Sequence, residues 1–177
     1  MSEAPTDRLR RRVLWAMPTG LFLIGSRAEV DGTVVRNLMT ASLVVQVATD
    51  PKLVAVAVDT TAVTHDLLSA GGCFSVCLLH RDDKAVVRRF VKPVPIDQVL
   101  TDAQGKAVSM AGEAVFEAAT GAPVLTRSLG WLDCEVRHRL DLHSHELFVG
   151  EVVAVGGPDG DLEGVLRMED TRMSYGG

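Results

Sequence analysis

The 177-residue chain has few cysteines, few aromatic residues and no long apolar run. Cys73, Cys77 and Cys134 stand in apolar surroundings, which is typical of reduced, buried thiols and not of a disulfide framework. No stretch approaches the roughly 18 consecutive apolar residues that a membrane-spanning helix needs. These absences predict a cytoplasmic protein that makes no contact with a membrane.

Several catalytic motifs are also missing. The chain contains no GxSxG, GxxxxGK, GxGxxG or CxxC pattern. Hydrolase, NTPase, Rossmann and thioredoxin interpretations therefore lose their usual support. If a nicotinamide cofactor is used, it binds without a Rossmann fold.

Positive charge is scarce as well, with 18 Lys and Arg against 23 Asp and Glu and a net charge of −5. Nucleic acid is therefore not an expected partner, because neutralising phosphates requires clustered basic residues. The one basic run, Arg8, Arg10, Arg11 and Arg12, indicates a solvated helix start. The apolar residues that follow this run are interrupted by Pro18, so they are too few for the hydrophobic core of a signal peptide.

What the sequence does have is valine, in short runs separated by Gly, Asp, Thr and Pro. It contains 26 Val, 20 Leu and only 2 Ile, which favours many short strands. Residues 20–26 and 33–36 flank Asp31 and Gly32, and Asp-Gly between apolar runs is a strong hairpin signal. The first two strands should therefore pair antiparallel.

Two more strands should follow over residues 41–49 and 53–58, with Asp50 and Pro51 in the turn between them. The second is apolar at every position, which predicts burial on both faces.

Sequence patterns typical of helices begin after these strands. Residues 61–70 carry a hydroxyl cap, an early acid and a glycine stop, and residues 82–91 have acids first and bases last, so both predict helices. Residues 73–79 between them have strand character. Residues 94–126 fit no clear pattern, and we expect an excursion from the main sheet with a helical piece over 107–119.

The clearest strand covers residues 131–142, where apolar and charged residues alternate. An apolar strand over residues 145–155 should pair with it, across a turn that carries His143, Ser144 and His145. The residues expected to face the core are Leu132, Cys134, Val136, His138, Leu140 and Leu142, and those expected to face water are Asp133, Glu135, Arg137, Arg139 and Asp141.

No internal repeat or low-complexity linker divides the chain, so one domain over residues 1–177 is expected. The predicted fold class is mainly β, with an antiparallel barrel and a few helices packed outside it.

The segment RNLMTAS places Asn37, Thr40 and Ser42 just before an apolar strand. Their polar groups could bind a planar ligand that carries carbonyls and ring nitrogens. The alternative is local hydrogen bonding, because turns are generally rich in these residue types.

Three hydroxyls, those of Thr60, Thr61 and Thr64, gather at the start of the first predicted helix. Unpaired backbone N–H groups and the helix dipole favour an anion there, such as a phosphate, whereas simple capping explains only one of the three. Arg88 and Arg89 could supply the positive charge that a phosphate needs. Their alternative role is that of surface charges.

His143, His145 and Glu151 partly match the first metal motif of cupin barrels. No histidine follows residue 145 to complete a second motif, so we expect no metal site. His138 is expected to be a hydrogen-bonded histidine of the core or its rim.

Eight blocks, in this order and spacing, are similar to the flavin reductase family of FMN-binding split β-barrel proteins. The resemblance covers residues 13–155 and leaves residues 156–177 as a tail. The blocks are GLFLIGS, RNLMTAS, VQVATDPKLVAVAVD, TTAVTHDL, GGCFSVCLL, RRF, WLDCEV and SHELFVGEV.

The resemblance implies a homodimer of split barrels that binds FMN or FAD near the subunit interface and takes hydride from NADH or NADPH. His145 would lie near the flavin ring and the nicotinamide, as an orienting or proton-supplying residue. Cys77 replaces an Asn that is frequent in the family, and Tyr175 offers a late aromatic contact. The other implied flavin-binding residues are Asn37, Thr40, Ala41 and Ser42 for the ring and ribityl chain, and Thr60, Thr61, Thr64, Arg88 and Arg89 for the phosphate.

The function that the resemblance implies is an NAD(P)H-dependent flavin reductase, which could supply reduced flavin to a monooxygenase component. The flavin itself carries the hydride and electron chemistry, so no conspicuous acid–base pair is required of the protein. A non-enzymatic FMN-binding electron carrier or sensor is the alternative.

Overall fold

The hairpin expected around Asp31 and Gly32 opens the main sheet. The computed structural model describes residues 5–171 and 173, and in it β1 (Phe22–Val30) pairs antiparallel with β2 (Thr33–Ala41). Asp31 and Gly32 have φ of 50° and 74°, which suits the tight turn that matches strand twist. The prediction is confirmed.

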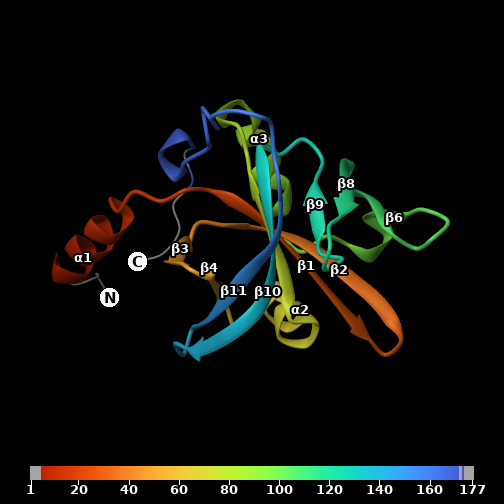
Figure 1. Ribbon diagram of the computed structural model, residues 1–177. Helices are drawn as coiled ribbons and strands as arrows, with labels where there is room; N and C mark the ends of the chain where they lie inside the picture. The colour runs from red at the N-terminus through yellow and green to blue at the C-terminus, as the bar shows by residue number, and fades with distance from the viewer. Residues whose placement is uncertain (1–4, 172, 174–177) are drawn as a thin grey trace.

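Seven antiparallel strands form the main sheet, in the order β2-β1-β5-β10-β11-β4-β3 (Figure 1). The mainly β, antiparallel class is therefore confirmed. Within the described residues the edge strands β2 and β3 do not pair with each other, so no closed barrel is formed. The remaining strands are β3 (Val44–Thr49), β4 (Lys52–Asp59), β5 (Cys73–Leu78), β10 (Gly130–Asp141) and β11 (His145–Gly156).

Helices form where the sequence predicts them. α2 (Val63–Gly71) ends at Gly72, whose φ of 66° allows its N–H to bond Leu68 O. Its N-cap residue is Ala62, which makes no side-chain capping hydrogen bond. The expected hydroxyl cap is therefore absent. The second expected helix is a series of short turns: η1 (Arg81–Asp83), α3 (Lys84–Val87) and η2 (Arg88–Phe90).

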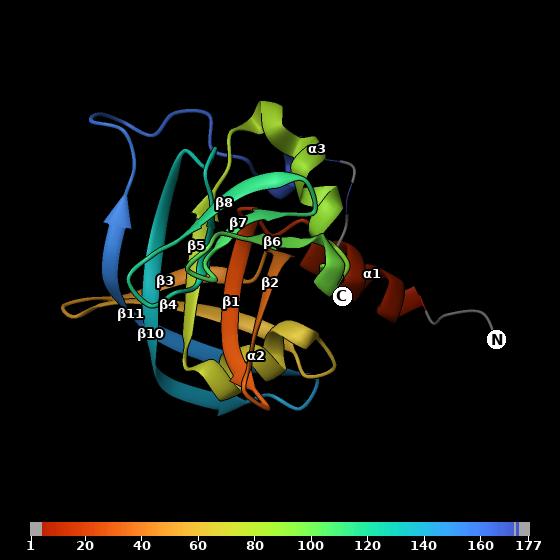
Figure 2. The same ribbon diagram turned by 90° about the vertical axis from the view of Figure 1, so that its right-hand side faces the viewer.

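The N-terminal helix α1 (Pro5–Trp15) lies apart from the sheets in both views (Figures 1 and 2). Arg8, Arg10 and Arg12 are exposed on it, which confirms a solvated basic helix. Across the described residues, every helix is too short or too polar to cross a membrane.

The helix expected over residues 107–119 is wrong, because this segment is a β-hairpin. Ala111 and Gly112 form its turn, with φ of 49° and 79°, and burial of Met110 and Val115 against distant segments overrides the helix propensity of this alanine-rich segment. The segment belongs to a second, four-stranded sheet in the order β6-β7-β8-β9, whose strands are labelled between Figures 1 and 2. Its elements are η3 (Ile96–Gln98), β6 (Val99–Thr101), β7 (Ala107–Met110), β8 (Glu113–Glu117) and β9 (Pro123–Leu125), and a last short helix, η4 (Met168–Asp170), follows β11.

The strict alternation expected along β10 is also wrong. Register shifts interrupt its pairing with β11 between Asp133 and Cys134 and again between Val136 and His138. Asp133 is consequently buried, where it accepts hydrogen bonds from the backbone N–H and the hydroxyl of Thr120. His138, expected in the core or at its rim, is exposed, as are Leu140 and Leu142.

Two apolar clusters hold these layers together. One lies between the main sheet and α2 and includes Ile24, Leu68 and Phe148. The other joins the main sheet to the second sheet and the short helical turns, and includes Phe90 and Leu125.

The three cysteines are free and buried, as expected. Burial raises the pKa of Cys77 to about 11 and that of Cys134 to about 12. Both thiols are therefore protonated near neutral pH and behave as small core residues.

Gly25 allows the second sheet to approach the first. A Cβ at this position would overlap the Pro123 carbonyl oxygen and Ser75 Oγ, which donates a hydrogen bond to that carbonyl. We expect Gly25→Ala to lower the free energy of unfolding by about 1–3 kcal/mol through overpacking, measured by urea denaturation.

The adjacent residue provides a matched control. Ser26 Oγ is buried without a hydrogen-bond partner in the described structure, so Ser26→Ala should be neutral or stabilising. Equal losses in the two variants would contradict the packing argument.

Candidate functional site

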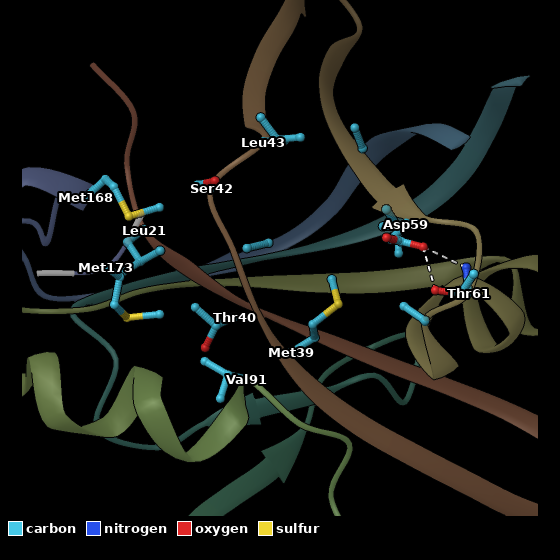
Figure 3. Close-up of a pocket in the computed structure, with 14 residues that line it drawn as sticks. Leu21, Met39, Thr40, Ser42, Leu43, Asp59, Thr61, Val91, Met168 and Met173 are labelled. Carbon is cyan, nitrogen blue, oxygen red and sulfur yellow. Dashed lines mark hydrogen bonds between the residues drawn. The ribbon is translucent and has the colours of Figure 1, made fainter. Parts of the chain in front are cut away.

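A cavity of about 280 Å³ opens where β2 ends, where β4 ends and where the C-terminal segment returns to the sheet (Figure 3). Its volume is close to the roughly 300 Å³ at which small-molecule pockets begin. It is lined by Leu21, Met39, Thr40, Ala41, Ser42, Leu43, Ala57, Val58, Asp59, Thr61, Ala62, Val91, Met168 and Met173.

One wall is the end of RNLMTAS. Thr40 Oγ1 donates to Val87 O at 2.6 Å, which fixes its side chain against the short helical turns. Ser42 is 5% exposed, and its hydroxyl makes no hydrogen bond to the described part of the chain. Among the described residues only Ser26 Oγ is buried without a partner, so the Ser42 hydroxyl is accessible at the cavity that it lines. It can therefore donate to or accept from a ligand there.

A second wall is apolar. The thioethers of Met168 and Met173 line the cavity beside Leu21, and Met39 lies nearer its centre (Figure 3). Flexible, polarisable methionine side chains adapt well to a flat aromatic surface. Met168 and Met173 follow the last long strand, and no local sequence signal placed them at the site.

Asp59 and Thr61 form the polar end of the cavity (Figure 3). Asp59 Oδ1 accepts the backbone N–H of Thr61 at 2.8 Å and the Thr61 hydroxyl at 2.7 Å. These bonds, with smaller contributions from His145 and His65, hold the pKa of Asp59 below its usual value. Asp59 was not among the sequence candidates, although an Asp two residues before a Thr is a known turn signal.

The other two threonines are occupied within the protein. Thr60 donates its hydroxyl to Ser144 O at 3.4 Å. Thr64 is buried and accepts from the Asn37 amide at 2.9 Å, and Asn37 Oδ1 in turn accepts the Val94 N–H at 2.9 Å. Thr60, Thr64 and Asn37 therefore surround the cavity without lining it.

Several sequence candidates lie away from the cavity. Arg88 is exposed, and Arg89 donates to Ala111 O and lies 3.4 Å from Glu113. Cys77 is fully buried and accepts from the Leu125 N–H. Tyr175 falls outside the described residues.

His145 is half-buried at the start of β11, in register with Asp59. Its Nδ1 lies 3.0 Å from Ser144 Oγ. It is outside the cavity lining, next to the polar end.

A charged cluster that the sequence analysis missed joins α2 to the β10–β11 hairpin. Arg139 donates to both carboxylate oxygens of Glu146, at 2.7 and 2.8 Å, and His65 Nε2 lies 2.8 Å from Glu146 Oε2. The Arg139 guanidinium also stacks over Phe148, 5.1 Å from its ring centre. The hydrogen bonds from Arg139 and then those from His65 lower the pKa of Glu146 to about 2.

No group of three or more His, Cys, Asp or Glu side chains within the described ranges could hold a metal ion.

The fold and cavity define a class: a small antiparallel β protein with a partly open, mostly apolar cavity beside the ends of β2 and β4. The family model described as "Flavin reductase like domain" matches residues 14–176. The chain therefore belongs to the flavin reductase-like family.

Three known proteins illustrate the similarity. The NADH-dependent flavin reductase StyB of Pseudomonas fluorescens is 29% identical over 149 residues, covering 84% of this chain and 78% of that protein. The NADH:FAD oxidoreductase SgcE6 of Streptomyces globisporus superimposes with a TM-score of 0.68 at 25% identity, covering 89% and 87% of the two chains. The styrene monooxygenase flavin reductase of Pseudomonas putida S12 superimposes with a TM-score of 0.64 at 29% identity, covering 85% of this chain and 87% of that chain.

The Glu146 cluster should make stability depend on pH. Because the folded pKa of about 2 lies below the usual 4.5, the carboxylate stabilises the fold above pH 4.5, and that contribution is lost as pH falls toward 2. We expect Glu146→Gln to cost about 1–2 kcal/mol at pH 7. In urea denaturation, the difference in free energy of unfolding between Glu146→Gln and the parent should shrink as the pH falls from 4.5 toward 2.

Glu135→Gln is the matched control on the same hairpin. Glu135 forms an exposed ion pair with Arg137 at 2.8 Å, so its loss should stay within about 0.5 kcal/mol. A pH-independent difference for Glu146→Gln would contradict the role of its charge.

Proposed function

We propose that this chain is an NAD(P)H-dependent flavin reductase that binds FMN or FAD in the cavity beside Ser42. The observation that carries the proposal is a mostly apolar cavity lined by the MTAS segment, in which the Ser42 hydroxyl makes no hydrogen bond to the described part of the chain and is accessible to a ligand. Similarity to StyB and SgcE6, which are named for NADH-dependent flavin and FAD reduction, supports it.

The residues present fit a flavin, whose ring is flat and largely apolar with polar groups along one edge. When bound, NAD(P)H supplies a hydride and the flavin ring accepts it. Thr40, Ala41 and Ser42 would contact the ring, and the methionines would exclude water from it. Asn37 and Thr64 would hold the wall behind them.

NADH is the first donor to test, because both StyB and SgcE6 are named for it. Reduced flavin would then pass to a monooxygenase component, since one related structure is named as the reductase of styrene monooxygenase. A cytoplasmic location fits this role.

The direct experiment mixes purified protein with excess FMN or FAD and NADH or NADPH under anaerobic conditions. A reductase should oxidise many equivalents of nicotinamide for each protein chain and bleach the free flavin. A non-enzymatic carrier or sensor would hold flavin without such turnover, and that outcome would contradict the proposal.

His145 should act in turnover more than in folding or flavin binding. It lies beside the polar end of the cavity without lining it. We expect His145→Ala to slow flavin reduction by NADH at least about tenfold, or about 1.4 kcal/mol of transition-state stabilisation, measured by stopped flow. Flavin affinity should change much less.

His143→Asn is the control on the other side of the same turn. His143 is exposed with a φ of 68°, a conformation that Asn tolerates. If both variants reduce flavin at the parent rate, His145 has no part in the reaction.

We also propose that the chain forms a homodimer of split barrels. Large apolar side chains are exposed along β3, β10 and β11, and such a surface is typical of an interface. Each is at least 40% exposed: Val45, Val47, Leu140, Val153 and Val155.

Light scattering should therefore give about twice the chain mass of 19.0 kDa. The double variant Val45→Glu with Val47→Glu should shift the mass toward the monomer, because it places charges in the proposed interface. Val30→Glu is the control. Val30 is similarly exposed, but it is the last residue of β1, outside the proposed interface on β3, β10 and β11. A monomeric parent would contradict the proposal.

A further inference from the structure

The two polar side chains at the polar end of the cavity, Asp59 and Thr61, present hydrogen-bond acceptors to it. The backbone N–H and the hydroxyl proton of Thr61 both go to Asp59 Oδ1. Thr61 Oγ1 therefore offers the cavity only its lone pairs, and Asp59 adds those of its carboxylate (Figure 3). Both donors of Thr61 on which a phosphate site would depend are therefore already used.

Positive charge is also missing from this end. Among the described residues that line the cavity, none is Lys, Arg or His. Two histidines face Asp59 from neighbouring elements, His145 from β11 and His65 from α2. His65 is bonded to the carboxylates of Glu146 and Asp66, so any positive charge on it is shared with these acids.

The hydroxyls of nearby threonines do not replace these donors. The Thr60 hydroxyl donates to Ser144 O, and Thr64 is buried against Asn37. The lowered pKa of Asp59 means that its carboxylate is charged at neutral pH. An anionic acceptor favours ligand hydroxyls, which donate hydrogen bonds, and repels a phosphate.

We propose that Asp59 is a specificity-determining residue that binds hydroxyl groups of the flavin's ribityl chain and excludes a phosphate from this end of the cavity. The inference rests on the proposed flavin site and replaces the phosphate expected at Thr61. The chain therefore selects a flavin by its ring and polyol and gains no affinity from the terminal phosphate of FMN.

Riboflavin and FMN provide the test, because they differ only by that phosphate. Titration of each into the full-length protein at pH 8, where imidazoles are ordinarily neutral, gives their ratio of dissociation constants. We expect the parent to bind FMN no more tightly than riboflavin. Asp59→Asn removes the charge while keeping an acceptor for Thr61, and should shift the ratio toward FMN at least about fivefold.

Asp66→Asn is the matched control. Asp66 is in the first turn of the same helix but outside the cavity lining. It should leave the ratio within about twofold of the parent value, because its charge is exposed and screened.

A second variant covers the case in which Asp59→Asn fails to fold. Thr61→Val removes the hydroxyl, so it should weaken or leave unchanged the binding of both flavins equally. An FMN-selective loss in Thr61→Val would show a phosphate at Thr61 and overturn the inference.

Two further outcomes would overturn it. One is a parent that binds FMN at least tenfold more tightly than riboflavin, and the other is a folded Asp59→Asn protein whose ratio does not change. If the parent binds neither flavin, the proposed function itself fails and the inference falls with it. Failure of the proposed function can be told apart from failure of the inference, because only the former abolishes flavin binding by the parent protein.

Discussion

The buried amide of Asn37 joins the three segments on which the site depends. It donates to Thr64 on α2 and accepts from the Val94 N–H, while its own backbone lies in β2. Each buried polar group in this set has a partner, so the arrangement carries little desolvation penalty. The end of β2, the start of α2 and the chain entering the second sheet are thus held in register, and the cavity forms beside them.

Local signals predicted the elements whose geometry is set within a few residues. Asp31 and Gly32 determine their own turn, and Gly72 ends α2 through its own backbone conformation. Residues 107–119 could not be predicted in this way, because their strands are stabilised by burial of Met110 and Val115 against distant segments. Tertiary contacts override weak helix propensity in such cases.

The candidate site shows the same division. The polar RNLMTAS segment predicted Thr40 and Ser42, the family resemblance added Ala41, and all three line the cavity. The neighbouring threonines were interpreted as free donors, since sequence shows a hydroxyl but not its partner. Thr61 cannot donate to a ligand because its hydroxyl proton goes to Asp59. Thr64 cannot reach one because it is buried, where it accepts from Asn37, a residue distant in sequence.

The cavity is polar at one end and apolar at the other, and this asymmetry constrains how any flavin can enter. Hydroxyl groups placed against Met168 and Met173 would lose their bonds to water without replacement, at a cost of about 1–3 kcal/mol each. The same hydroxyls beside Asp59 find acceptors. The apolar part of the ring has the opposite preference. Binding therefore needs no catalytic acid–base pair to orient the ligand, because desolvation alone distinguishes the two orientations.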